Sequence, residues 1–376
     1  MIPVNEPRLD GRELEYVTEC LNTGWISSAG HFLERFEQTW ASYCDRRYGV
    51  AVSNGTVALQ LAIAALRLQP GDEVIMPAFT IISCAMAVVY EGGIPVLVDS
   101  DPDTWCMDVT QVEARITSRT RAIMPVHIYG HPVDMDPLLR IAEKYGLAIV
   151  EDAAEAHGAQ YLSKLGPEPE WRRCGSFGEL SCFSFYANKL VTTGEGGMVV
   201  TDDESLAKRL RELRNLAFAP ERRFLHRELG FNFRMTNIQA AIGQAQAERI
   251  DETVKRKRAI RQRYVEELGS LAGIQLQIER PWAKSVGWMN GFVLNASSGH
   301  TAASAAKALA DLGVETRPFF VGMNRQPALR ARGWFDGESF PVTDRLAEMG
   351  LYLPSGVALT DRQQDTVIAA VKQALA

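Results

Sequence analysis

Short apolar runs alternate with helix-like stretches over the first 200 residues of the chain. The runs are almost continuously apolar, which is typical of strands that are buried on both faces of a sheet. Stretches of helical length between consecutive strands indicate crossover connections, and these join parallel strands. The pattern therefore predicts an α/β fold whose mostly parallel sheet is covered by helices on both faces. The expected strands span residues 49–53, 73–77, 95–99, 122–127, 147–152, 180–185 and 197–201, with helices at 57–68, 82–90 and 137–145.

The pattern changes after Thr236. Residues 236–271 read as one long helical region, and its Arg-rich second half indicates a solvent-exposed connector. Because 376 residues exceed one simple core, we expect a large domain over residues 1–245, including the N-terminal segment. The connecting helix and a smaller C-terminal α+β domain would fill residues 246–376. In that second part a strand, a helix and a strand are expected at residues 291–294, 302–312 and 315–319.

The composition argues against several function classes. A net charge of −6 disfavours nucleic-acid binding, because phosphate backbones favour a basic surface. No stretch approaches the roughly 18 apolar residues of a membrane span, and the N-terminus does not read as a signal peptide. The cysteines are scattered without a CxxC pair, which indicates reduced thiols in a cytoplasmic protein and no metal site. They are Cys20, Cys44, Cys84, Cys106, Cys174 and Cys182.

Lys189 lies between two apolar runs, in a turn rich in threonine and glycine. Lysine is almost always solvated, so a lysine between two core strands needs an explanation. One interpretation is a surface lysine at the tip of a hairpin. The other is a lysine that forms a Schiff base with an aldehyde and later transfers protons. The position of Lys189 alone leaves both interpretations open.

Asp152 ends another apolar run, at the edge where parallel sheets bind ligands. As a structural residue it would cap a helix that begins at Ala153. As a functional residue it would supply the carboxylate that a pyridoxal cofactor requires at its pyridine nitrogen. Glu155 follows three residues later and would face the same crevice, at the ring hydroxyl. We interpret His157 as a packed histidine outside the catalytic set.

Residues 53–56, with the sequence SNGT, join an apolar run directly to a helix. A glycine and free backbone amides at a helix N-terminus suit phosphate binding, although an ordinary capped helix start reads the same way. The sequence has neither the GxxxxGK[ST] loop nor a GxGxxG fingerprint after its first strand. Gly55 and Thr56 are therefore candidate phosphate ligands, and Ser184 adds a hydroxyl five residues before Lys189. Phosphate site, ring-nitrogen carboxylate and aldehyde-binding lysine follow the chain order of a fold type I pyridoxal enzyme.

Seven segments carry a family resemblance over nearly the whole chain. They are TGWISSAG, VSNGTVAL, GDEVIMP, AIMPVHIYG, EDAAEAHGA, FSFYANKLVTTGEGGM and GFNFRMTNIQAAIG. The chain resembles the DegT-type nucleotide-sugar aminotransferases, and the last three segments are highly specific to that family. The resemblance implies an aspartate aminotransferase-like, fold type I enzyme that depends on pyridoxal 5'-phosphate (PLP). Lys189 would be its Schiff-base lysine, Asp152 the partner of the ring nitrogen and Glu155 the contact of the ring hydroxyl.

The resemblance also implies a homodimer with two shared active sites. Asn232, in GFNFR, matches the residue that family members contribute to the phosphate of the neighbouring subunit. L-Glutamate is the expected amino donor, and the acceptor is a nucleotide-linked keto sugar, with C4 of GDP-4-keto-6-deoxymannose as the first choice. Cations are needed for a diphosphate substrate, and each candidate is otherwise an ordinary surface residue. The candidates are Arg222, Arg223, His226 and Arg317.

Two departures from the family pattern concern the sugar rather than the chemistry. Family members commonly stack an aromatic residue on the pyridine ring, two positions after the place of Phe79, and here that residue is Ile81. We expect Ile81 to pack on the ring through its aliphatic face, the alternative being that Phe79 substitutes. The other departure is the segment 162–178, which reads as a long loop before a core strand. Three of its residues are candidate nucleotide contacts: Trp171, Arg172 and Arg173.

Other functions make different demands on these residues. An aminotransferase for another nucleotide-linked 3- or 4-keto sugar would need the same cofactor set. A sugar dehydratase of this family would carry histidine in place of Lys189. A non-enzymatic binding or regulatory protein on the same scaffold would have lost cofactor residues that this sequence retains. A nicotinamide oxidoreductase is disfavoured by the missing glycine fingerprint.

Overall fold

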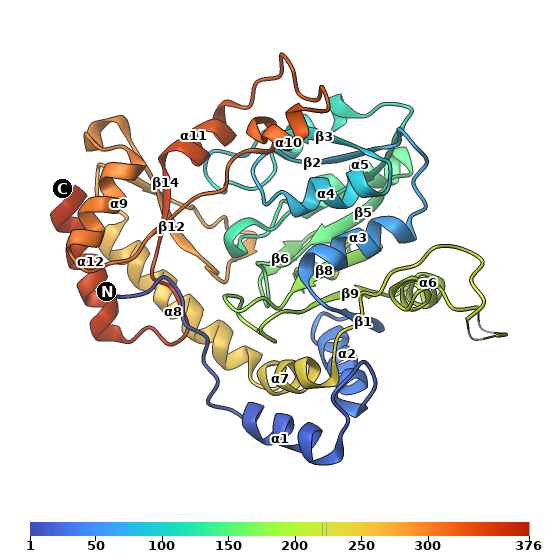
Figure 1. Cartoon of the computed structure of the whole chain (residues 1–376). Coiled ribbons are helices and arrows are strands. Elements are labelled where there is room, and N and C mark those ends of the chain that lie inside the picture. Colours follow the sequence, from blue (N-terminus) through green and yellow to red (C-terminus); the bar gives the residue numbers. More distant parts are fainter. Residues whose placement is uncertain (220, 223, 376) are drawn as a thin grey trace.

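A seven-stranded sheet forms the centre of the computed structural model, which describes residues 1–219, 221–222 and 224–375 (Figure 1). The strand order is β1-β9-β8-β5-β4-β2-β3. Within this sheet only β9 runs antiparallel to its neighbours. The predicted α/β class with a mostly parallel sheet is therefore confirmed. The strands are β1 Tyr48–Val52, β2 Glu73–Pro77, β3 Ile94–Val98, β4 Thr120–Ile123, β5 Ala148–Asp152, β8 Leu180–Ser184 and β9 Gly197–Thr201.

Two predicted elements end earlier than expected, each for a local reason. The strand expected over 122–127 ends at Ile123, because Pro125 has no N–H group to donate to the ladder. The helix expected over 57–68 is α3, Gly55–Ala65, and Arg67 beyond it adopts a left-handed φ of 57°. The other two predicted helices are present as α4, Ser83–Tyr90, and α5, Met135–Tyr145.

Alternation along β8 fixes which helices cover which face of the sheet. The thiol of Cys182 donates to a backbone carbonyl of α3, at 3.5 Å. The ring of Phe183 instead packs edge-on against Trp40 of α2, His31–Tyr43, with 5.2 Å between centroids. In the neighbouring strand β5, Glu151 pairs with Ser181 and Asp152 with Cys182. Glu151 and Asp152 therefore face opposite sides of the sheet, Asp152 toward α3 and Glu151 toward α2.

The C-terminal part of the chain forms a second sheet, antiparallel, in the order β10-β12-β14-β13. The predicted strand, helix and strand are present as β12, α9 and β13, although β13 is only two residues long. The N-terminus also joins this part, since Ile2 bridges to Val314. The division at residue 245 stays a prediction. The elements are β10 Ile274–Leu276, β12 Asn290–Leu294, α9 Ala302–Asp311, β13 Arg317–Pro318, α10 Pro327–Arg330, α11 Pro341–Met349, β14 Gly350–Leu353 and α12 Asp361–Leu375.

The helical region expected over 236–271 is two helices rather than one: α7, Asn237–Ala247, and α8, Ile250–Leu268 (Figure 1). Arg249 separates them with a non-helical φ of −124°. The expected solvent exposure of the Arg-rich half is also wrong for one face of α8, where Lys257 is 3% and Arg261 7% exposed. Hydrogen bonds to backbone carbonyls offset the cost of burying these side chains. Arg261, for example, donates to the carbonyl of Gln277 at 2.9 Å.

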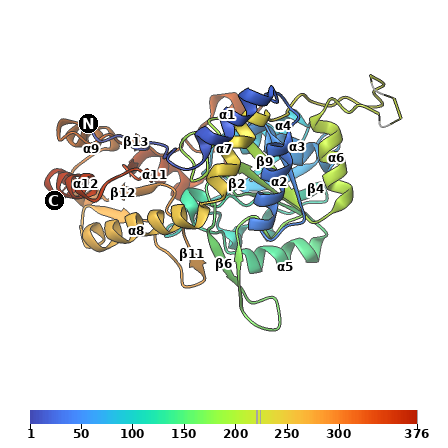
Figure 2. The ribbon, with the colours of Figure 1, turned by 90° about the horizontal axis from the view of Figure 1, so that it is seen from below.

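The segment expected to be a long loop, 162–178, contains a β-hairpin that is prominent in Figure 2. Its strands are β6, Gln160–Ser163, and β7, Glu170–Arg173, and β11, Ala283–Lys284, pairs with β6 from the other side. Of the Gly and Pro residues read as loop signals, Gly166, Pro167 and Pro169 lie in the turn between these strands, and Gly175 and Gly178 follow β7. The remaining helices are α1 Glu13–Thr23, which packs on α7, and α6 Glu204–Arg214, which packs on α3. Across the described ranges, no helix combines the length and apolar character required to cross a membrane.

Candidate active site

A cavity of about 590 Å³ opens where β1, β2, β5 and β8 end. In a parallel sheet the carboxyl ends of neighbouring strands meet at one edge, so residues distant in sequence converge there. The cavity brings together seven of the predicted site residues: Gly55, Thr56, Ile81, Asp152, Glu155, Ser184 and Lys189. Trp288, Phe320 and Tyr352 complete its lining from the C-terminal half of the chain.

Lys189 is buried in this cavity, with 10% of its side chain exposed, so the surface-lysine interpretation is wrong. Its Nζ lies 3.8 Å from Oε1 of Glu155 and 3.7 Å from the ring centroid of Trp288. Burial lowers the pKa of Lys189 and raises the pKa of Glu155 to about 7, against the attraction between the two groups. The lowered pKa of Lys189 increases the share of the uncharged amine, which is the form that attacks an aldehyde.

Asp152 has a carboxylate that is only partly occupied by protein donors. Its Oδ1 accepts from the N–H of Ala154 at 3.0 Å, and its Oδ2 accepts from the thiol of Cys84 at 3.1 Å. The first bond resembles the predicted capping role, but the residues from Ala153 onward form turns rather than a helix. Because Asp152 also lines the cavity, it retains the lone pairs to accept from a ligand.

The start of α3 lies against β8 at the predicted phosphate site. Asn54 caps the helix by accepting from the N–H of Val57 at 3.0 Å. A Cβ atom on Gly55 would come within 2.6 Å of the Cβ of Ser184, so only glycine fits at this position. The first amides of a helix have no partner within it, and here they face the cavity edge beside two hydroxyls. Those hydroxyls belong to Thr56 and Ser184.

Phe79 and Ile81, the two candidates for the residue that packs on the pyridine ring, differ in how far their side chains are exposed. Phe79 is fully buried and packs on Phe319 and Tyr129, with centroids 5.9 and 6.0 Å apart. Ile81 is 45% exposed and lines the cavity. Of the two, Ile81 therefore has the free surface that a planar ring would contact. His157 is a packed histidine, as predicted, because burial lowers its pKa to about 3 and its Nδ1 accepts from a backbone amide at 3.3 Å.

Those of the remaining predicted ligands that the structure describes do not line this cavity of their own chain. Asn232 is exposed and accepts from Arg234 at 2.9 Å. Arg222 and His226 belong to an extended segment that protrudes from the body after α6 (Figure 2). Arg317 pairs with Glu315 at 2.7 Å on the exposed edge of the second sheet. Arg223 lies outside the described residues.

The three candidate nucleotide contacts of the hairpin are engaged within the chain and do not line the cavity. The Nζ of Lys284 lies over the ring of Trp171, 3.8 Å from the ring centroid. The guanidinium carbon of Arg172 lies 4.5 Å from the ring centroid of Phe177, and that of Arg173 lies 4.5 Å from the ring centroid of Tyr43.

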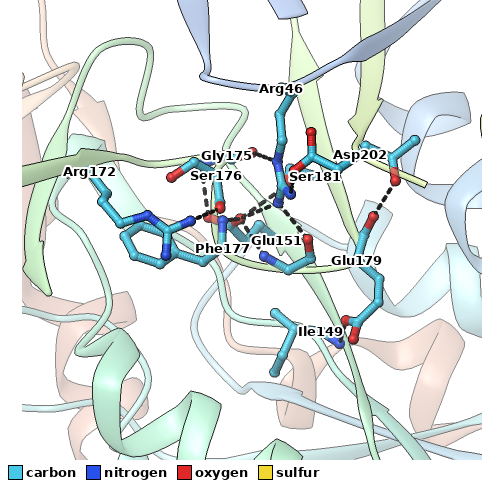
Figure 3. Close-up of polar contacts among 12 residues, drawn as sticks. Arg46, Ile149, Glu151, Arg172, Gly175, Ser176, Phe177, Glu179, Ser181 and Asp202 are labelled. Atoms are coloured by element: carbon cyan, nitrogen blue, oxygen red, sulfur yellow. Dashed lines mark hydrogen bonds and ion pairs between the residues drawn. The ribbon is translucent and has the colours of Figure 1, made fainter. Parts of the chain in front are cut away.

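Glu151 is a buried carboxylate that sequence analysis missed, and its hydrogen bonds stabilise the fold (Figure 3). Its carboxylate is completely buried and accepts from the backbone amides of Gly175, Phe177 and Gly178 at 2.7–3.0 Å. Ser181 and His127 add bonds at 2.9 and 3.0 Å. Burial would raise the pKa of Glu151, but these donors together with nearby Arg46 lower it to about 2.

Trp288, Phe320 and Tyr352 were also missed, because aromatic residues within apolar runs read as core. Sequence spacing gives no sign that a segment 100 residues beyond Lys189 returns to cover it. One signal was available. Trp288 directly follows Gly287, which marks a turn just before a short apolar strand, and a turn at this place sets the direction of the large side chain.

Comparison with known proteins identifies the family of the chain. The model of the DegT/DnrJ/EryC1/StrS aminotransferase family matches residues 7–372. The chain is 43% identical to the GDP-perosamine synthase of Caulobacter vibrioides, covering 100% of this chain and 98% of that protein. It is 41% identical to the GDP-perosamine synthase of Escherichia coli O157:H7, covering 96% and 95%.

A solved structure shows the same fold. DesV of S. venezuelae, crystallised in complex with a ketimine intermediate, superimposes with a TM-score of 0.88 at 35% identity, covering 96% of this chain and 94% of DesV. The resemblance, the fold type and the enzyme class predicted from sequence are thereby confirmed. The chain belongs to the DegT/DnrJ/EryC1/StrS aminotransferase family.

Proposed function

We propose that the chain binds PLP and transfers the amino group of L-glutamate to C4 of GDP-4-keto-6-deoxymannose, forming GDP-perosamine. The observation that carries the proposal is the convergence of Lys189, Asp152, Glu155 and the start of α3 on one cavity. The two synthases described above, similar over nearly their whole length, support the choice of sugar. The reaction suits the cytoplasm, and the six cysteines are buried free thiols, as a reducing compartment favours.

The residues present fit the cofactor. Gly55 lets the start of α3 approach Ser184 closely, so that the first amides of the helix and the hydroxyls of Thr56 and Ser184 line the cavity together, where a phosphate would bind. Asp152 has free acceptor capacity for a protonated ring nitrogen, and Ile81 offers an aliphatic surface to the ring. When bound, PLP supplies the electron sink that allows a proton to leave the carbon next to the amino group.

The roles of the protein groups follow from their environments. Lys189, whose pKa is lowered by burial, would hold the aldehyde carbon of the cofactor and, once released, would move the proton between carbon centres. Asp152 would keep the ring nitrogen protonated. Glu155, with a pKa of about 7, would hold or release a proton at the ring hydroxyl near neutral pH. The ring of Trp288 lies over the amine, 3.7 Å from its Nζ, and would shield it from water.

We further propose a homodimer whose active sites are shared. Apolar side chains are exposed in two segments that carry family motifs or lie next to one: Trp25 is 58%, Ile26 48% and Leu229 93% exposed. A second copy would cover them and bring Asn232 to the neighbouring phosphate site. Arg222 and His226, on the same protruding segment, would then reach the substrate diphosphate together with Arg317. Light scattering should give twice the mass of one chain, and a fully active monomer would contradict this arrangement.

The sugar is tested by supplying the protein with L-glutamate and 4-keto or 3-keto sugars linked to GDP, dTDP or UDP. We expect turnover with GDP-4-keto-6-deoxymannose and formation of 2-oxoglutarate. Turnover of a dTDP- or UDP-linked sugar in its place would move the assignment to another nucleotide sugar. If no sugar were aminated although glutamate was deaminated, the acceptor would not be a sugar of these classes.

A further inference from the structure

Trp288 is connected to both halves of the active site through its backbone and its side chain. Its indole N–H donates to the carbonyl of Asn188 at 2.8 Å, directly before Lys189. Its backbone N–H donates to the carbonyl of Tyr129 at 3.1 Å, and the N–H of Tyr129 donates to Glu155 at 2.7 Å. The ring face itself lies over the Nζ of Lys189.

Lys257 of α8 holds the one remaining polar group of the Trp288 backbone. Its Nζ donates to the carbonyl of Trp288 at 2.7 Å and to the carbonyl of Ser355. Ser355 follows β14, whose Tyr352 lines the same cavity. One buried amine therefore connects the long helix α8 to two of the three C-terminal segments that line the site, those of Trp288 and Tyr352.

Lys257 occupies an unfavourable place for a lysine. It is 3% exposed, and burial lowers its pKa to about 7 with no acidic side chain among the described residues offsetting this. An apolar residue would avoid the cost of burying the amine. Both carbonyls accept from Lys257 whether it is charged or neutral, since even the neutral amine has two N–H donors. The bonds to Trp288 and Ser355 are therefore what this residue contributes.

We propose that Lys257 is a positioning residue of this active site, which fixes the Trp288 indole over the amine of Lys189 by holding the Trp288 and Ser355 carbonyls. The inference rests on the proposed role of Lys189, but its test uses cofactor-free protein. Without Lys257 two buried carbonyls lose their donor, and the loop that carries Trp288 is free to move away from Lys189. The amine of Lys189 then becomes accessible.

The test measures how fast acetic anhydride labels Lys189 in the full-length, cofactor-free chain, by mass spectrometry of the Lys189 peptide. We expect Lys257→Met to accelerate labelling of Lys189 about threefold or more, since the loss of one buried hydrogen bond corresponds to a factor of this order. Lys255→Met, an exposed position on the same helix, is the matched control and should leave the rate unchanged. Thermal unfolding is recorded for each variant.

A double-variant cycle separates positioning from general loosening. In a Trp288→Leu background, Lys257→Met should no longer change the labelling of Lys189, because the group through which it acts is gone. Equal acceleration in both backgrounds, or unchanged labelling in Lys257→Met with only a lower melting temperature, would overturn the proposal. If Lys257→Met does not fold, Trp288→Leu alone decides, and unaltered labelling of Lys189 in it overturns the proposal. None of these outcomes depends on whether the chain aminates a sugar.

Discussion

Two buried glutamates four residues apart, Glu151 and Glu155, show what hydrogen bonding does to the same side chain. Glu151 accepts five hydrogen bonds and has a pKa of about 2. Glu155 accepts one backbone N–H, lies 3.8 Å from an amine whose own pKa is lowered, and has a pKa of about 7. Burial is nearly equal, at 0% and 6% exposed. Donor supply rather than burial therefore separates a carboxylate that stabilises the fold from one that is left available for chemistry.

The difference begins with the strand β5 and its surroundings. Glu151 faces the side of α2, where the backbone N–H groups of Gly175, Phe177 and Gly178 donate to its carboxylate (Figure 3). Asp152 and Glu155 face the cavity, where fewer protein donors are within reach. The fully hydrogen-bonded carboxylate of Glu151 therefore fixes the backbone beside the site, whereas the neighbouring carboxylate of Asp152 keeps free acceptor capacity toward the cavity.

The largest effect should follow Lys189→Met. We expect transamination to fall by about 10³-fold or more, because the amine that holds the cofactor and moves the proton is gone. Stability should change little, since an apolar side chain replaces a buried amine. Activity assays and urea unfolding measure the two quantities, with exposed Lys208→Met as control. A large loss of stability with retained turnover would make Lys189 a structural residue like Glu151.

Glu151→Gln should cost about 3 kcal/mol or more in the free energy of unfolding. Glutamine keeps one acceptor oxygen, but its amide group would face N–H donors that then lack an acceptor. Glu155→Gln should cost about 1 kcal/mol or less, because few donors would be left without an acceptor. Exposed Glu170→Gln is the control. Equal losses in the two buried variants would remove the distinction between them.

The pH dependence of stability should separate the two groups in cofactor-free protein. The pKa of Glu151 lies below its ordinary 4.5, so its contribution is present above pH 4.5 and is lost as the pH falls toward 2. The pKa of Glu155 lies above 4.5, so its contribution is present below pH 4.5 and is lost as the pH rises through 7. Each amounts to roughly 1–3 kcal/mol. Glu151→Gln should flatten only the acidic decline and Glu155→Gln only the decline toward neutral pH; the reverse assignment would contradict the comparison.

Strand positions were predictable because fully buried parallel strands are almost continuously apolar, as Val74, Ile75 and Met76 of β2 are. Lys189 and Asp152 were selected because Lys189 lies in the turn between two such strands and Asp152 ends one, places where a charged side chain has few structural reasons to be. Glu151 was not, since its donors are backbone amides more than 20 residues away and leave no mark in the sequence. The burial of Lys257 was missed for the same reason, because its acceptors are backbone carbonyls of distant segments.

The smallest effect is expected for Cys84→Ala. The thiol of Cys84 donates to Asp152, so its removal leaves that carboxylate with one protein donor. A neutral bond of this kind contributes about 1 kcal/mol, which corresponds to a few-fold loss in kcat. Cys44→Ala, another buried thiol outside the site, should leave kcat unchanged. If both variants lost activity equally, Cys84 would act through packing and not through Asp152.

We propose above all that the amine of Lys189 holds the cofactor. It lies beside Glu155, whose carboxylate accepts only one backbone N–H among the described residues. Protein saturated with PLP is treated with borohydride, digested, and its peptides are weighed. The account predicts one added cofactor mass on the Lys189 peptide, and its absence when L-glutamate is added first. Label on another lysine, above all the second buried lysine Lys257, or no label despite active transamination, would contradict it.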